Sequence, residues 1–289
     1  MFPMSLKLLV PVVGLLAAGG LGLQCHQIAR PEALLPAKVP DTPIRPIDAE
    51  ADDQTAQLAR SDPLGFLQHC LDRYDAARVR DYTCTFITEQ RINGSLTPVQ
   101  EARVRFRERP FSVDMFFVRN PVDAQRALYV QDAWRDDMGR ELAWFKPAGA
   151  IVKLFVPKIQ QPISGQRAKA NSRRTLDEFG FRRTLEVILK YSQRGYQNQE
   201  LRLQFIGQGQ IDGRSTYVFE RHLPYTGQEE PYPDALLRYH IDREWLVPTG
   251  CYSFADHEGR NLLGSYVTTD IRFNVGLMDA DFDPTKLGF

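Results

Sequence analysis

Residues 81–119 read DYTCTFITEQRINGSLTPVQEARVRFRERPFSVDMFFVR. From Tyr82 to Phe86, apolar and polar side chains alternate, and they alternate again over residues 102–107. A period of two is typical of a β-strand that buries one face. Asn93 and Gly94 lie between the two segments and favour a tight hairpin turn. The stretch therefore predicts an antiparallel hairpin with one apolar side and one side facing water.

Further strand candidates extend this hairpin into a sheet. They are residues 110–121, 127–132, 141–145, 149–156, 200–206, 214–221, 235–242, 250–255 and 262–274. Strands joined by turns of hairpin length form antiparallel pairs. About eleven strands in a single sheet cannot stay flat, so we expect the sheet to curl.

Two helices are expected beside this sheet. Asp62 and Pro63 supply an N-cap and a first-turn proline for a helix over residues 62–79. Thr175 and Glu178 form a capping box that predicts a second helix over residues 175–194. Two helices are too few to cover both faces of the sheet. The sequence therefore predicts an α+β fold, in which a strongly curved antiparallel sheet forms an unclosed barrel with both helices on its concave side.

The amino-terminal segment has the composition of an export signal. An apolar run over residues 8–23 follows the single charge of Lys7. We therefore predict that residues 1–25 are a signal peptide or an N-terminal anchor. Cys25 stands where lipoproteins are acylated, but the residue before it is Gln24 rather than a small residue. We expect Cys25 not to carry a lipid.

Residues 26–60 contain five prolines and an acidic patch, which predicts a flexible tether or a plain leader before a domain at 61–289. The formal net charge of the chain is zero, and the charges are interspersed. This argues against a nucleic-acid partner, which calls for a basic face. We expect an exported monomer of the periplasm or cell envelope, either free or tethered to a membrane at its N-terminus.

No pattern in the sequence predicts a catalytic, metal or cofactor site, and we expect none. The nearest catalytic candidates are His222, His240 and Asp242, which have no recognisable partner pattern. The histidines do not show the spacing of zinc ligands. Asp279, Asp281 and Asp283 begin like a calcium loop, but Pro284 stands where that loop needs glycine.

Three cysteines fall inside the predicted domain, and two of them are candidates for a disulfide. Cys70 and Cys84 are close in sequence and form the favoured pair, although spacing alone does not fix the connectivity. Exported proteins are where such bonds form and persist. Cys251 would then remain a free thiol.

Apolar side chains that alternate along neighbouring strands should project to one face of the sheet. They either fill a packed core or line a cavity for a hydrophobic ligand. Under the second interpretation the ligand-binding candidates are Val104, Phe106, Val113, Met115, Phe117 and Trp144.

The stretch VRDYTCTFITEQRINGSL…EARVRFRERPFSVDMFFVRNP resembles an uncharacterised bacterial domain-of-unknown-function family. That family is similar to the LolA-like outer-membrane lipoprotein-sorting group. The resemblance rests on Arg109-Pro110-Phe111-Ser112-Val113 and on the later Tyr239-His240-Ile241-Asp242 with Pro248, and it covers residues 62–285. It implies an unclosed antiparallel barrel whose mouth is plugged by helices.

Because LolA-like proteins carry acyl chains without catalysing a reaction, the resemblance also implies a function. We expect a non-enzymatic envelope protein that binds acyl chains of a lipid or lipoprotein in a hydrophobic concave cavity. The alternative is a structural or scaffold protein with a packed interior and no ligand. An unrecognised hydrolase is the third hypothesis, and it would require a cleft that gathers the histidine and aspartate candidates.

Overall fold

The structure is a computed structural model, and it describes residues 54–149, 158–164, 170 and 172–289. The predicted α+β class is confirmed, because the described strands form one antiparallel sheet. The strands are β1 (Asp81–Ile92), β2 (Ser95–Leu96), β3 (Gln100–Arg107), β4 (Ser112–Arg119), β5 (Ala124–Val130), β6 (Leu142–Pro147), β7 (Ile159–Pro162), β8 (Arg202–Ile211), β9 (Arg214–His222), β10 (Leu236–Asp242), β11 (Pro248–Phe254) and β12 (Leu262–Phe273). The strand expected at 149–156 lies almost entirely outside the described residues.

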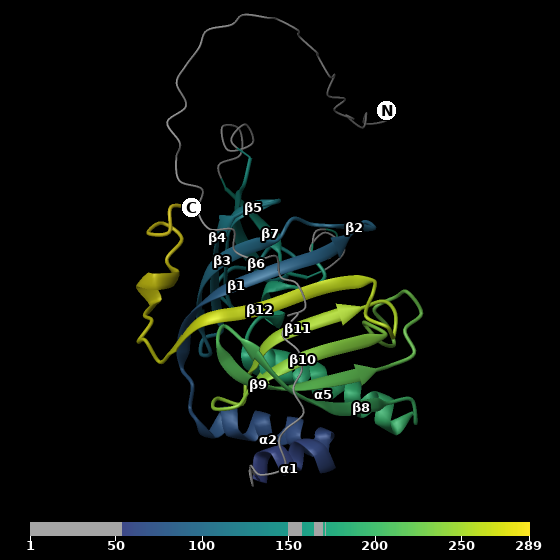
Figure 1. The fold of residues 1–289 in the computed structure, drawn as a ribbon. Coiled ribbons are helices and arrows are strands. Elements are labelled where there is room, and N and C mark those ends of the chain that lie inside the picture. The colour runs from purple at the N-terminus through teal and green to yellow at the C-terminus, as the bar shows by residue number, and fades with distance from the viewer. Residues whose placement is uncertain (1–53, 150–157, 165–169, 171) are drawn as a thin grey trace, which may run out of the picture. The chain divides into compact units, whose positions relative to one another are not determined.

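The sheet is open, as predicted. Its strand order is β7-β6-β5-β4-β3-β1-β12-β11-β10-β9-β8, with β2 paired to β1 off this path. The central strand β1 joins two meanders, since it pairs with β3 on one side and with β12 on the other (Figure 1). Strands β7 and β8 form the two edges and do not pair with each other.

Three α-helices are described, and the first corrects the predicted tether. They are α1 (Gln54–Ser61), α2 (Pro63–Ala76) and α5 (Phe181–Gln197). In α1, Ala56 and Ala59 are 1% and 0% exposed, so residues 54–60 belong to the folded domain. Helix α2 begins as predicted, because the Asp62 carboxylate accepts the backbone N–H of Gly65 at 2.8 Å. Residues 1–53, with the predicted signal or anchor and most of the tether, lie outside the described residues.

The predicted start of the second long helix at Thr175 is wrong, although the capping interaction is present. The Glu178 carboxylate accepts the Thr175 backbone N–H at 3.0 Å and stabilises a short 3₁₀ turn, η1 (Leu176–Glu178). Gly180 then adopts φ = +113°, and α5 begins only at Phe181. A Cβ at Gly180 would lie 2.9 Å from the Phe106 ring, so the position needs glycine for space as well as for conformation.

Two apolar clusters pack between the helices and the concave face of the sheet. The first joins α1, α2 and α5 to β9 and β10, and it includes Phe66, Leu185, Ile188, Phe219 and Tyr239. The second joins the start of α5 to β1, β3 and β4, and it includes Tyr82, Phe106, Val113 and Phe181. Figure 1 shows α5 behind β9 to β11, on the inner side of the sheet. The predicted placement of helices on the concave side is therefore confirmed.

The predicted disulfide between Cys70 and Cys84 is wrong. Both residues, like Cys251, are buried free thiols. Cys70 belongs to the first cluster and Cys84 to the second, so their side chains face different parts of the core. Burial raises the pKa of the Cys251 thiol to about 12 and that of the other two further still. All three thiols are therefore protonated at neutral pH.

The carboxyl-terminal residues 277–289, here called the tail, pack against the outer face of β5 and β6. They include the 3₁₀ turn η2 (Asp279–Phe282), and Phe282 and Leu287 form a cluster with Leu128 of β5. The Lys146 side chain of β6 donates to the backbone carbonyl of Gly288 at 2.7 Å. The tail thus covers apolar side chains that would otherwise face water.

The aspartates of the tail are engaged separately. Asp279 pairs with Arg107 at 2.7 Å, while Asp281 and Asp283 accept backbone N–H groups of the tail itself. Among the described residues, no group of three or more His, Cys, Asp or Glu side chains is placed to hold a metal ion. Likewise, none of the helices in the described ranges has the length and apolar character to cross a membrane.

Candidate functional site

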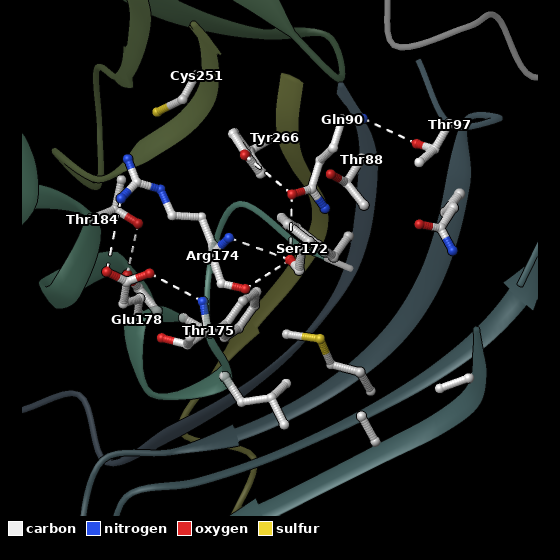
Figure 2. Close-up of a pocket in the computed structure, with 18 of the residues that line it drawn as sticks. Thr88, Gln90, Thr97, Ser172, Arg174, Thr175, Glu178, Thr184, Cys251 and Tyr266 are labelled. Carbon is white, nitrogen blue, oxygen red and sulfur yellow. Dashed lines mark hydrogen bonds and ion pairs between the residues drawn. The ribbon is translucent and has the colours of Figure 1, made fainter. Parts of the chain in front are cut away.

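The inner face of the sheet encloses a cavity of about 520 Å³. Its walls come from β1, β4, β5, β6 and β7 on one side and from α5, β11 and β12 on the other, with the segment 172–180 between them. Figure 2 shows the polar side chains of this segment and of β1 gathered along one side of the cavity. A volume of this size lies in the range of roughly 300–1,000 Å³ that is typical of sites for small organic ligands.

The strand register explains which apolar side chains form the wall. Met115 of β4 pairs with Ala127 of β5, and Ala127 pairs with Phe145 of β6. Paired residues on adjacent strands project to the same face, and all three side chains line the cavity together with Phe117. The structure therefore brings the predicted residues Met115 and Phe117 to the cavity.

Three other predicted residues lie on the inner face but do not line the cavity. Val104, Phe106 and Val113 are 2%, 1% and 0% exposed and belong to the packed second cluster. The Phe106 ring stacks on Tyr82 with 4.7 Å between the ring centroids. These side chains pack beside the cavity wall, and direct contact with a ligand would require repacking.

The prediction that Trp144 contributes to the cavity is wrong. Trp144 pairs with Leu128, and both side chains project to the outer face. There the indole packs beside Phe289 of the tail, with 6.3 Å between ring centroids. The next residue, Phe145, occupies the position expected of Trp144, because successive residues of a strand face opposite sides.

A polar network ties the segment 172–174 to β1 at one side of the cavity. The Gln90 side-chain oxygen accepts the backbone N–H of Arg173 at 2.8 Å and the hydroxyl of Ser172 at 3.3 Å. The Tyr266 hydroxyl of β12 lies 3.5 Å from the same oxygen (Figure 2). Burial raises the pKa of Tyr266, so this hydroxyl stays protonated and able to donate.

Two arginine side chains reach the cavity from different elements. Arg221 of β9 is 1% exposed and is paired with the equally buried Asp234 at 3.0 Å. Arg174 lies 3.8 Å from the carboxylate of Glu178, and its side chain keeps 36% of its surface. Figure 2 shows the Arg174 side chain extending toward Cys251 beside Glu178. The sequence did not predict charged residues inside the cavity.

The catalytic candidates do not come together. His240 contacts the Thr216 hydroxyl at 2.9 Å, and burial together with Arg238 lowers its pKa to about 4. The Asp242 carboxylate is held by Arg214 at 2.6 Å. In the β9–β10 register, His222 lies opposite Leu236 and His240 lies opposite Val218, four positions farther along the strand pair. None of the three candidates is among the residues that line the cavity.

Comparison with known proteins finds several solved structures that match part of this chain. A putative outer membrane lipoprotein-sorting protein domain from Vibrio parahaemolyticus is 14% identical, with a TM-score of 0.36, and the match covers 76% of this chain and 99% of that one. The Mycobacterium tuberculosis lipoprotein LppX is 14% identical, with a TM-score of 0.42 and coverage of 77% and 100%. A chain of the Pseudomonas aeruginosa MucA/MucB complex is 15% identical, with a TM-score of 0.41 and coverage of 75% and 60%.

Identities of this size carry no information about a shared ligand. No curated protein sequence matches the chain. One family does match, and it is described as "Protein of unknown function (DUF1571)". The match runs over residues 79–287, from just before β1 into the last residues of the tail. The chain belongs to this DUF1571 family.

Proposed function

We propose that this protein is a non-enzymatic cell-envelope protein that binds acyl chains of a lipid or lipoprotein in the cavity. The observation that carries the proposal is an apolar wall, made by Met115, Phe117, Ala127 and Phe145, around about 520 Å³ of space. Burying each methylene of an acyl chain contributes ~0.8 kcal/mol, so a dozen of them contribute roughly 10 kcal/mol. A binder of this kind needs a sheltered apolar surface and no reactive group.

The cavity favours a ligand over the scaffold alternative. A packed structural module would fill its interior, because an apolar void that cannot collapse costs roughly 24 cal/mol per Å³. Water in this space would lack hydrogen-bond partners along the wall formed by β4, β5 and β6. An acyl chain supplies the missing contacts along that wall.

The proposal includes an exported location and a monomeric state. Residues 1–25 would direct the chain out of the cytoplasm or anchor it, and the segment after them would hold the domain near a membrane. Acyl chains of envelope lipids or lipoproteins would then be within reach. Mass spectrometry of the mature amino terminus checks this part of the proposal, since cleavage before residue 26 or retention of the anchor gives different masses.

The experiment for the central proposal is extraction and titration. The full-length protein is purified, its bound lipids are extracted with organic solvent and identified by mass spectrometry, and the delipidated protein is titrated with a fluorescent fatty acid. We expect co-purifying acyl compounds and saturable binding at one site. Clean extracts together with an absence of saturable binding would support the packed-scaffold alternative instead.

A further inference from the structure

Residues 172–178 form one side of the cavity. This side carries a positively charged side chain, Arg174, which burial of an acyl chain against the apolar wall does not require. The Arg174 guanidinium is 3.8 Å from a Glu178 carboxylate oxygen, which is longer than a hydrogen bond. The other Glu178 oxygen accepts the Thr175 backbone N–H at 3.0 Å, and this contact holds the carboxylate in the 3₁₀ turn. The five N–H donors of Arg174 are therefore left without a hydrogen bond to any other side chain of the described residues.

Arg221, the second arginine at the cavity, is a guanidinium whose hydrogen bonds stabilise the fold, and it serves as a comparison for Arg174. Arg221 donates to Asp234 at 3.0 Å and to the backbone carbonyl of Ile188 at 3.2 Å. Its side chain is 1% exposed, whereas that of Arg174 is 36% exposed and lines the cavity. Both terminal nitrogens of Arg221 thus donate to protein partners, and only its Nε has none, whereas Arg174 keeps its guanidinium donors available to the cavity.

We infer that Arg174 binds the carboxylate of a ligand whose acyl chain lies along Met115, Phe117 and Phe145, which makes a long-chain monocarboxylic acid the preferred ligand class. The inference rests on the proposed function and narrows it. A carboxylate matches the planar guanidinium with two parallel hydrogen bonds, and the Tyr266 hydroxyl and Ser172 lie in the polar network beside it.

The competing carboxylate of Glu178 does not block this site. A ligand carboxylate at hydrogen-bonding distance gains charge-assisted bonds that the 3.8 Å pair does not make. Removal of the Glu178 charge should nevertheless help the ligand, because like charges repel within a site of low dielectric constant. Arg174 and Glu178 should therefore have opposite effects on the affinity for an acid.

The test compares palmitic acid with methyl palmitate, which has the same chain without a charge. Both displace the neutral fluorophore N-phenyl-1-naphthylamine from the delipidated full-length protein. We expect the acid to bind about ten- to a hundredfold more tightly than the ester, the factor that charge-assisted hydrogen bonds provide. Arg174→Gln should erase this preference, and Arg174→Lys, which keeps the charge but loses the planar fork, should keep part of it.

Two further variants complete the design. Arg202→Gln is the matched control, since the exposed Arg202 side chain of β8 donates to Gln204 and does not line the cavity, so the preference for the acid should persist. Glu178→Gln should raise the affinity for the acid and leave that for the ester unchanged. Equal affinities of the wild type for acid and ester, or an equal loss of both in Arg174→Gln, would overturn the carboxylate site alone. If neither compound binds, the proposed function fails, and this inference fails with it.

Discussion

Both faces of β4, β5 and β6 carry apolar side chains, but these side chains are covered in different ways. On the outer face, Leu128 and Trp144 are covered by Phe282 and Leu287 of the tail. On the inner face, the paired residues Met115, Ala127 and Phe145 border a cavity. The difference teaches that apolar character alone does not identify a ligand surface. The two faces differ in whether another segment of the same chain packs over their apolar side chains.

The largest effect on stability should come from removing the cover of the outer face. Phe282→Ala deletes a ring that is 3% exposed, and large-to-small changes of this kind cost about 3 kcal/mol or more. We expect a corresponding drop in the free energy of unfolding, measured by urea denaturation, with methyl palmitate binding unchanged. A loss of ligand affinity without a loss of stability would mean that the tail belongs to the binding site.

The largest effect on binding should come from a charge on the inner face. Met115→Asp places a carboxylate in the apolar wall, and burying an unpaired charge beside a ligand costs several kcal/mol. We expect binding of methyl palmitate to fall by more than a hundredfold in a displacement titration. The matched control is Met138→Asp, the same substitution at a side chain that is 76% exposed, and it should leave binding unchanged.

Met115→Asp also weakens packing, so its loss of binding alone does not separate ligand contact from folding. A second variant tests ligand contact without adding a charge. Ala127→Leu adds volume at the cavity wall without adding charge, at a cost to stability of about 1–3 kcal/mol. If the cavity holds the ligand, this folded variant should lose affinity for long acyl chains. Undiminished binding in Ala127→Leu would contradict the assignment of the inner face.

A pair of neighbouring residues gives the most direct contrast between the faces. Phe145→Ala should weaken ligand binding by about tenfold, since it removes apolar contact worth roughly 1–3 kcal/mol, and it should lower stability only modestly. Trp144→Ala should lower the free energy of unfolding by about 2 kcal/mol and leave binding unchanged. Both quantities are measured on both variants, and the reverse pattern would exchange the roles of the two faces.

The smallest effect concerns pH. The folded-state pKa of His240 is lowered to about 4 by burial, so below its ordinary value of about 6.5 the unfolded chain binds a proton that the folded chain does not. Stability should therefore fall as pH drops from 7 to 5.5, by about 1 kcal/mol. A His240→Gln variant should show a flatter profile in urea denaturation. Neither face of β4–β6 contains histidine, so methyl palmitate binding should not change over this range.

The sequence predicted the sheet well because period two is a local signal. The alternation around Tyr82, the Asn93-Gly94 turn and the inward set Met115 and Phe117 all depend on neighbouring residues. The assignment of Trp144 was wrong for a physical reason. Where both faces of a strand are apolar, alternation no longer distinguishes the inside from the outside, and the cover from the distant tail is not visible locally.

Other features could not be predicted because they depend on contacts between distant segments. Arg174 lies in an irregular segment without periodicity, and only the fold places it against β12 and α5. Its position next to the Thr175–Glu178 capping box was the one signal available, and that box was assigned to the wrong element. The disulfide was predicted from sequence spacing, but Cys70 and Cys84 belong to different clusters of the core.

Photolabelling tests the central claim about the two faces most directly. A palmitic acid analogue with a diazirine in its chain is bound to the full-length protein, irradiated and mapped by peptide mass spectrometry. We predict crosslinks at Met115, Phe117 and Phe145, which disappear when excess palmitic acid competes. Competed crosslinks at Trp144 or in residues 277–289, with none on the inner face, would contradict the account.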